Sequence, residues 1–349
     1  MNKIKIFIEL TRLNKPIGFM LLFWPCLWGL TLGFHQTKEF GLFVKYIILF
    51  FVGSVLMRSA GCIFNDIVDK DFDKKVDRTK NRPIPSGRIS AQESFVYLIL
   101  LYFIALIILI QFNFLTIVLG LLSMPFAFSY PYMKRLTYWP QLFLGLTFNW
   151  GILMGWTAFI GEISLEPILL YIAAIFWTLG YDTIYGFQDI NDDEIIGVKS
   201  TSIKFKENYK IFIGLCYFVC VLFLIILGFL EGNAIYYFTF LIFPVMHLFY
   251  QMSRLDRNNS NSCLIVFKSN NFFGFLVFLS FILDFFSAYP PGWYLLSPRS
   301  DTFFPLKIYF FIPSIRFFFS LCFFADFRWI LVGGGGKLRG LCTRSSQTA

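Results

Sequence analysis

The sequence predicts an all-α fold: a polytopic membrane bundle of nine transmembrane helices around a central cavity, with acidic motifs on its cytoplasmic face. Of the 349 residues, 57% are apolar and only 15% are charged, which is typical of a membrane protein. The mean hydropathy of +0.66 agrees. The expected spans are nine apolar runs at about residues 16–34, 43–64, 93–111, 114–130, 139–160, 167–187, 211–230, 234–250 and 271–289.

Basic residues predict the orientation of these runs. With a cytoplasmic N-terminus, twenty Lys and Arg residues fall in the arm and loops on the cytoplasmic side, and only Lys38 falls in the loops on the other side. Those cytoplasmic segments are residues 1–15, 65–92, 131–138, 188–210 and 251–270. The positive-inside rule supports this orientation. The formal charge of +9 therefore indicates topology and contact with the lipid bilayer, not binding of nucleic acid.

The N-terminal arm is charged and no small-residue cleavage site follows the first apolar run, so residues 1–15 are not a signal peptide. Ile6, Phe7, Leu10 and Leu13 share one face, which predicts a helix in the membrane interface. An Arg- and Ser-rich transit sequence is missing. This favours a bacterial cytoplasmic (inner) membrane over an organelle.

Cysteine and histidine do not indicate a soft metal site. The seven cysteines are scattered without a CxxC pair, and the two histidines, His35 and His247, are far apart in the sequence. Any metal ion should therefore be a hard cation bound by oxygen.

The first acidic segment, residues 65–83, reads NDIVDKDFDKKVDRTKNRP and ends the second apolar run. On a helix, Asp66, Asp69, Asp73 and Asp77 would share one face. Carboxylates on one face repel each other unless cations hold them together. Placing them at a bilayer surface therefore indicates a function.

The second acidic segment, residues 181–194, reads YDTIYGFQDINDDE and ends the sixth run. Asp182, Tyr185, Asp189 and Asp193 repeat the same spacing. Because both segments lie at the same face of the membrane and four spans apart, a four-helix pseudo-repeat would bring them to one cavity.

The spacing favours two Mg²⁺ ions that hold a diphosphate. Asp69 and Asp73 lie one helical turn apart, as do Asp189 and Asp193. Mg²⁺ is commonly bound by one or two carboxylates with substrate phosphate and water, and two such ions make diphosphate a leaving group. Asn65 is a further candidate ligand, and the candidate cations for diphosphate oxygens are Arg78, Arg82, Lys134, Arg135 and Lys199.

A charged site below a lipophilic cavity suits an amphiphile whose head binds the aspartates and whose tail lies between helices. Loss of diphosphate from an allylic chain leaves a carbocation, which aromatic rings can stabilise. Tyr130 and Tyr185 are the two rings that the sequence singles out.

Other interpretations of the acidic segments are less consistent with the sequence. Asp69, Asp71 and Asp73 match the start of an EF-hand, but Lys74 replaces its glycine and Lys80 its final glutamate. The segments could also be solvated loop ends. Two stripes of matching spacing on one face argue against that reading.

These residues resemble the motifs of the UbiA superfamily of intramembrane aromatic prenyltransferases. The motif NDxxDxxxD matches Asn65, Asp66, Asp69 and Asp73, and its RTxxRP continuation matches Arg78, Thr79, Arg82 and Pro83. The motif DxxYxxxDxxDD matches Asp182, Tyr185, Asp189, Asp192 and Asp193. The resemblance covers residues 8 to about 287.

The resemblance implies a nine-helix bundle, Mg²⁺ on Asp69, Asp73, Asp189 and Asp193, and attack of an aromatic ring on a prenyl carbocation. Residues 10–18, 129–135 and 180–185 are similar to the branch that joins polyprenyl diphosphate to 4-hydroxybenzoate, ortho to its hydroxyl, in ubiquinone biosynthesis. This similarity makes Arg135 a candidate contact of substrate or diphosphate. Arg12 could bind the benzoate carboxylate or could simply anchor the arm at the membrane.

Two other functions stay open from the sequence. A sister enzyme would prenylate dihydroxynaphthoate, homogentisate or haem. A cation or lipid transporter would use the acidic cavity, but transport predicts ionisable residues within the spans, whereas the aspartates gather at one surface.

The chain is expected to divide into a prenyltransferase-like membrane domain, residues 1–288, and a tail, residues 289–349. The tail is Phe-rich and then Gly-rich. It departs from the family pattern, and we interpret it as a non-homologous extension, of the kind that a shifted reading frame would produce.

Overall fold

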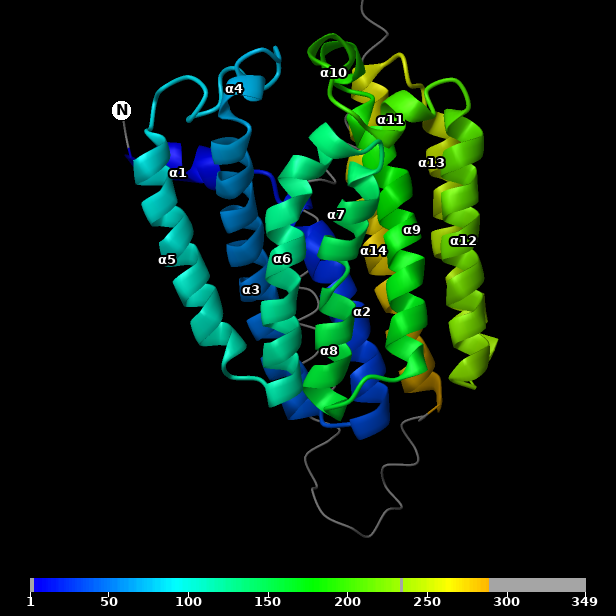
Figure 1. Cartoon of the computed structure of the whole chain (residues 1–349). Helices are drawn as coiled ribbons and strands as arrows, with labels where there is room; N and C mark the ends of the chain where they lie inside the picture. Colours follow the sequence, from blue (N-terminus) through cyan, green and yellow to red (C-terminus); the bar gives the residue numbers. More distant parts are fainter. Residues whose placement is uncertain (1–2, 233–234, 289–349) are drawn as a thin grey trace, which may run out of the picture. The chain divides into compact units, whose positions relative to one another are not determined.

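The computed structural model describes residues 3–232 and 235–288, and within them it contains helices and no strands (Figure 1). The expected tail, 289–349, lies outside the described residues. The helices are α1 (Lys3–Thr11), α2 (Ile17–Thr37), α3 (Phe40–Val68), α4 (Lys70–Asp73), α5 (Ala91–Leu109), α6 (Phe114–Leu136), α7 (Pro140–Phe148), α8 (Gly151–Ile160), α9 (Leu165–Gly186), α10 (Ile190–Ile196), α11 (Thr201–Lys204), α12 (Tyr209–Leu230), α13 (Ile235–Arg254) and α14 (Ser260–Ala288).

The predicted all-α bundle of nine spans is confirmed for the described part of the chain, where nine helical segments are long and apolar enough to cross a membrane. The protein is therefore a multi-pass membrane protein. The second and sixth spans are α3 and α9, so each acidic segment follows the span that the sequence predicted.

The fifth span differs from its prediction as one apolar run, because it breaks into α7 and α8. The side-chain amide of Asn149 donates to the Gly145 carbonyl and to the Thr178 hydroxyl, each at 2.8 Å. A side chain that bonds the backbone one turn back competes with helix continuation, and here it also ties the break to α9.

The N-terminal arm forms α1, as predicted, but α1 packs on the protein. Ile6 and Leu10 are buried in a cluster with Ala60 and Ile63 of α3. The apolar face of α1 therefore fixes the arm beside the end of α3 that leads to the first acidic segment, at the same end of the bundle as α4 (Figure 1).

The closest helix contact joins α2 to α8. Each helix carries a Gly-xxx-Gly pair, Gly29 with Gly33 on α2 and Gly151 with Gly155 on α8. A Cβ atom added at Gly29 would lie 2.2 Å from the carbonyl oxygen of Ile152. Small residues at these positions let two backbones touch, which is how helices associate in lipid.

Two indole-to-amide hydrogen bonds join α14 to α2 and α9. Trp24 of α2 donates to Asn271, and Trp177 of α9 donates to Asn270, each at 2.8 Å. Trp24 and Trp177 lie within membrane spans, where an unpaired polar atom costs several kcal/mol. The bonds therefore hold α2 and α9 in fixed places around α14.

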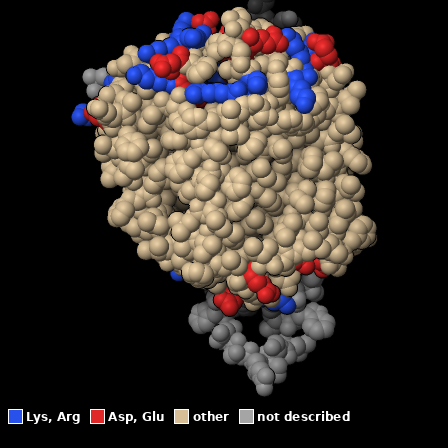
Figure 2. Space-filling model, in the orientation of Figure 1, with Lys and Arg blue, Asp and Glu red and all other residues tan. Residues whose placement is uncertain are grey.

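Charged side chains gather at the ends of the bundle. Figure 2 shows Lys and Arg concentrated at the end that carries α4 and α10, a broad band without charge, and mostly Asp and Glu at the other end. This distribution matches the predicted membrane topology. Both acidic segments lie at the basic end.

Replacing Gly29 by Ala should destabilise the bundle, because the new methyl group meets the backbone of α8. Overpacking typically costs about 1–3 kcal/mol. Thermal melting of the purified protein in detergent measures the effect. The control is Gly53→Ala on α3, where an added Cβ meets nothing within 4 Å. Equal melting temperatures for the two variants would contradict the packing argument.

Candidate active site

The first acidic segment is helical as far as Asp73. The amide of Asp69 donates to the Asn65 carbonyl at 2.9 Å, and the amide of Asp73 donates to the Asp69 carbonyl at 2.8 Å. Asp66, Asp69 and Asp73 therefore form one stripe, as predicted. The prediction for Asp77 is wrong, because α4 ends at Asp73 and Asp77 lies on an exposed loop, where it pairs with Lys80 at 2.6 Å.

Two arginines neutralise Asp66, whose side chain is only 1% exposed. Arg12 donates to its carboxylate at 2.5 Å, and Arg82 donates to the same oxygen at 3.1 Å. Arg82 also reaches Asp73 at 2.8 Å. Arg12 follows α1 with a φ of 56°, a left-handed conformation that is unfavourable for a residue with a side chain. Arg12 keeps this conformation while its side chain pairs with Asp66, and the pair holds the end of α1 at the site.

Asp69 is fully buried beside two cations from the end of α6. Lys134 donates to one carboxylate oxygen at 2.5 Å, and Arg135 approaches the other at 3.3 Å. Arg135 also donates to the Val68 carbonyl at 3.1 Å. Both predicted cations thus lie at the first acidic segment.

The second acidic segment is not a continuous helix. Asp182 and Tyr185 lie on the last turns of α9, which ends at Gly186, and Asp189 begins α10. The amide of Asp193 donates to the Asp189 carbonyl at 2.9 Å, so these two residues are one turn apart, as expected.

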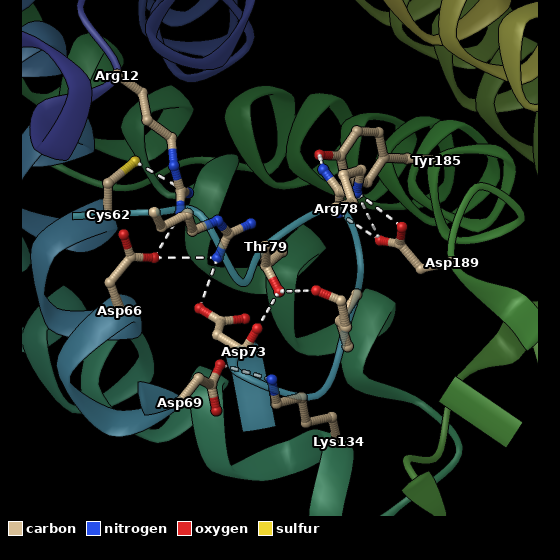
Figure 3. Close-up of polar contacts among 12 residues, drawn as sticks. Arg12, Cys62, Asp66, Asp69, Asp73, Arg78, Thr79, Lys134, Tyr185 and Asp189 are labelled. Atoms are coloured by element: carbon tan, nitrogen blue, oxygen red, sulfur yellow. Dashed lines mark hydrogen bonds and ion pairs between the residues drawn. The ribbon is translucent and has the colours of Figure 1, made fainter. Parts of the chain in front are cut away.

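Arg78 joins the two segments (Figure 3). Its Nε donates to the two carboxylate oxygens of Asp189 at 2.7 and 3.0 Å, and its Nη2 also donates to Asp189. Its Nη1 donates to the Tyr185 hydroxyl at 2.9 Å. Next to it, the amide of Asp77 donates to Asp192 at 3.3 Å. The loop that follows α4 within the first segment therefore contacts the second segment directly.

The surrounding charges act on the groups of this site that lie outside the spans. Burial raises the pKa of Asp193 to about 6, and the nearby Asp189 adds to the effect. Burial opposes the charge on Arg12 and Arg78, but adjacent acidic groups more than offset it and raise the pKa of both guanidinium groups. An additional cation beside Asp193 would therefore favour the charged form of its carboxyl.

Two predicted residues have other contacts. The Lys199 ammonium donates to the Leu136 carbonyl at 3.3 Å, and its amide donates to the Lys134 carbonyl at 2.8 Å. These bonds fasten the end of α6 to the chain after α10. Asn65 contributes its carbonyl to the helix, as described above. Direct roles for Lys199 in phosphate binding and for Asn65 in metal binding stay predictions.

Sequence reasoning missed Arg58, which lies on α3 two turns before Asn65, within the membrane span. Its guanidinium lies over the Phe148 ring at 5.4 Å, and its charge acts on Asp182 and Tyr130. Gly18 makes room for it, because a Cβ there would lie 2.9 Å from Arg58 Nε. The available signal was a lone arginine inside an apolar run, which by default indicates a functional site.

The donor set fits a hard divalent ion that is completed by substrate. Within the described residues, no three Asp, Glu, His or Cys side chains come together as a metal cage. The oxygen donors are instead paired carboxylates one turn apart in each segment. Such pairs suit Mg²⁺, which takes one or two carboxylates and keeps positions for phosphate oxygens and water.

Comparison with known proteins agrees with this geometry. The model of the UbiA prenyltransferase family matches residues 22–282. The chain is 43% identical over 282 residues to the rat protein "4-hydroxybenzoate polyprenyltransferase, mitochondrial". The match covers 79% of this chain and 74% of the rat protein. The chain is 40% identical to "4-hydroxybenzoate geranyltransferase 2" of Lithospermum erythrorhizon, with 81% of this chain and 91% of that protein covered.

The fold is also similar to a solved structure, a UbiA homolog from Archaeoglobus fulgidus bound to GPP and Mg²⁺. The TM-score is 0.61 at 17% sequence identity, with 80% of this chain and 99% of that chain covered. At this identity the comparison supports the fold alone.

Replacing Asp66 by Asn should destabilise the protein strongly, because it leaves the buried parts of Arg12 and Arg82 without their common counter-ion. Breaking a buried pair costs about 3–5 kcal/mol, and the partial exposure of both arginines puts the expected loss near the lower end. Asp71→Asn is the matched control, since Asp71 is 89% exposed and its nearest cation is 3.9 Å away. Thermal melting compares the two variants. An unchanged melting temperature for Asp66→Asn would show that the ion pairs of Asp66 with Arg12 and Arg82 do not stabilise the fold.

Proposed function

The chain belongs to the UbiA prenyltransferase family, and we propose that it transfers a polyprenyl group from polyprenyl diphosphate to the carbon ortho to the hydroxyl of 4-hydroxybenzoate. This reaction would serve ubiquinone biosynthesis. The observation that carries the proposal is the contact of Arg78 with Asp189 and Tyr185. It brings two acidic segments, 111 residues apart at this contact, to one place at the end of an apolar bundle. The named activities of the curated relatives support the choice of substrates.

The diphosphate would bind between the two segments. Asp69 and Asp73 on one side, and Asp189 and Asp193 on the other, would hold Mg²⁺, which would neutralise the diphosphate and favour its departure. Arg78, already at the junction, can donate two hydrogen bonds to phosphate oxygens. Arg82 of the first segment, and Lys134 and Arg135 at the end of α6, would supply further positive charge.

The prenyl chain would lie among the apolar spans with its first carbons near Tyr185 and Tyr130. When the bond from carbon to diphosphate oxygen breaks, the electron pair leaves with the diphosphate and an allylic cation remains. The electron-rich faces of these two rings would stabilise that cation. Tyr185 is held in place by its hydrogen bond from Arg78, whose guanidinium lies 5.3 Å from the ring centre.

The acceptor carboxylate would pair with Arg58 rather than with Arg12. Arg12 is already engaged with Asp66, whereas Arg58 lies deeper, at Asp182 and Tyr130. In this position the phenol oxygen would activate its ortho carbon toward the cation. That carbon would form the new bond and then lose its proton, and Asp182, on which the charge of Arg58 acts, would accept it.

The site would face the compartment that contains the N-terminus. The concentration of basic residues at this end supports that orientation. The expectation of a bacterial inner membrane has less support, because the rat relative is named as mitochondrial. We propose an inner membrane with its positive loops on the matrix or cytoplasmic side.

Membranes containing the protein should convert 4-hydroxybenzoate and a polyprenyl diphosphate into prenylated acid, and chelation by EDTA should abolish the product. Added Mg²⁺ should restore it, because the carboxylates need a divalent ion to bind diphosphate productively. Chromatography of the products measures both effects. Product formed only with dihydroxynaphthoate, homogentisate or haem as acceptor would contradict the proposal and indicate a sister enzyme.

Replacing Arg58 by Leu should raise KM for 4-hydroxybenzoate by about tenfold to a hundredfold, as expected for the loss of one or two charge-assisted hydrogen bonds at about 1.5–3 kcal/mol each. KM for the polyprenyl diphosphate should change little. Steady-state kinetics with each substrate varied in turn tests this. Equal increases in both KM values would contradict a specific role in acceptor binding.

A further inference from the structure

Three of the four carboxylates that we assign to metal binding, Asp69, Asp73 and Asp189, already have protein cations as partners. Lys134 and Arg135 contact Asp69, Arg82 contacts Asp73, and Arg78 contacts Asp189. When a guanidinium occupies both oxygens of a carboxylate, its positive charge repels a metal ion that approaches the same oxygens. The cations of the chain and a divalent ion therefore compete for the same oxygens.

Arg78 is placed to exchange its carboxylate for another anion. It comes from the loop between α4 and α5, and its side chain is 38% exposed, compared with 20% for Arg82. Its bonds to Asp189 are those of a bidentate pair, and a diphosphate offers the same planar group an equivalent set of oxygens. Its partner Asp189 lies at the start of α10 and directly precedes the turn that carries Asp193.

Tyr185 gives Arg78 a second point of attachment. The hydroxyl accepts from Nη1 at 2.9 Å, while Nε and Nη2 point to Asp189. The guanidinium also lies over the ring. Rotation about this attachment would turn two donors from the carboxylate to a phosphate without removing Arg78 from the site.

We propose that Arg78 is an exchangeable counter-ion: it holds Asp189 until diphosphate takes over its donors, and so makes divalent-metal binding at the second segment depend on diphosphate. This inference rests on the proposed function. It goes beyond it because it assigns the order of binding to one residue. Metal and diphosphate then strengthen each other's binding by the same factor, as linkage requires.

The exchange would keep the charge of Asp189 neutralised between turnovers, when no diphosphate is bound. Without diphosphate, Asp189 stays neutralised by Arg78, and the loop that carries Arg78 stays joined to the second segment. With diphosphate, the negative charge of Asp189 becomes available to the metal. The chain thereby avoids both an uncompensated carboxylate and a tightly held metal that lacks substrate.

The test measures protein-bound Mn²⁺ by equilibrium dialysis of the full-length purified protein in detergent, with and without pyrophosphate on both sides of the dialysis membrane, because pyrophosphate itself chelates Mn²⁺. In wild type, pyrophosphate should tighten Mn²⁺ binding by about tenfold, a coupling typical of linked sites. Arg78→Gln should bind Mn²⁺ alone about threefold to tenfold more tightly than wild type, since it removes a competing ion pair. The enhancement by pyrophosphate should fall to about threefold or less.

Lys80→Gln is the matched control, because Lys80 lies on the same loop, carries the same charge and pairs only with exposed Asp77 among the ion pairs of the described chain. It should bind Mn²⁺ as wild type does. Arg78→Lys should lie between wild type and Arg78→Gln, since a single ammonium cannot hold both oxygens. It decides the question if Arg78→Gln does not fold.

Equal Mn²⁺ affinity for wild type and Arg78→Gln, with equal enhancement by pyrophosphate, would overturn the exchange while leaving the proposed function intact. An equal gain in Lys80→Gln would also overturn it, because the effect would then be general loss of positive charge. No enhancement by pyrophosphate in any variant would overturn the proposed function itself, and the exchange with it.

Discussion

Carboxylates at the end of an apolar bundle repel one another and lose hydration, so cations must lie among them before the chain can fold. Here the cations come from separate parts of the sequence: Arg12 from the N-terminal arm, Arg82 from the loop after α4, and Lys134 from the end of α6. The pairs of Arg12 and Lys134 join the N-terminal arm and the end of α6 to the first acidic segment, and the pair of Arg82 with Asp73 closes that segment on itself. Ion pairs that neutralise these carboxylates thus hold together the end of the bundle that carries α4 and α10.

The membrane-spanning helices fix the positions of the elements that carry these charged residues. The glycine pairs bring α2 against α8, and indoles of α2 and α9 donate hydrogen bonds to asparagines of α14. These contacts fix the helices without water. On this frame α3 and α9 end at the same level, and Arg78 needs only the reach of one side chain to connect them. The apolar helix contacts and the ion pairs thus lie in separate parts of the structure.

Periodicity and motif spacing predicted much of this arrangement. Long apolar runs give spans because lipid leaves the backbone no other partner, and equal spacing in the two segments placed Asp69 near its cations and Asp189 at the same membrane face. The end of the helix at Asp73, which moves Asp77 away, depends on how the following loop packs. The role of Arg58 and the break at Asn149 depend on tertiary partners, Asp182 and Thr178, that no local pattern reveals.

The convergence of the two acidic segments is the central claim, and cross-linking measures it most directly. In a variant without the seven native cysteines, Asp77→Cys and Asp192→Cys should form a disulfide on mild oxidation, because the Asp77 amide lies 3.3 Å from the Asp192 carboxylate. Mass spectrometry of the digested protein identifies the cross-linked peptides. Failure to cross-link in folded protein, even with a short bifunctional thiol reagent, would show that the segments do not meet and would contradict the account.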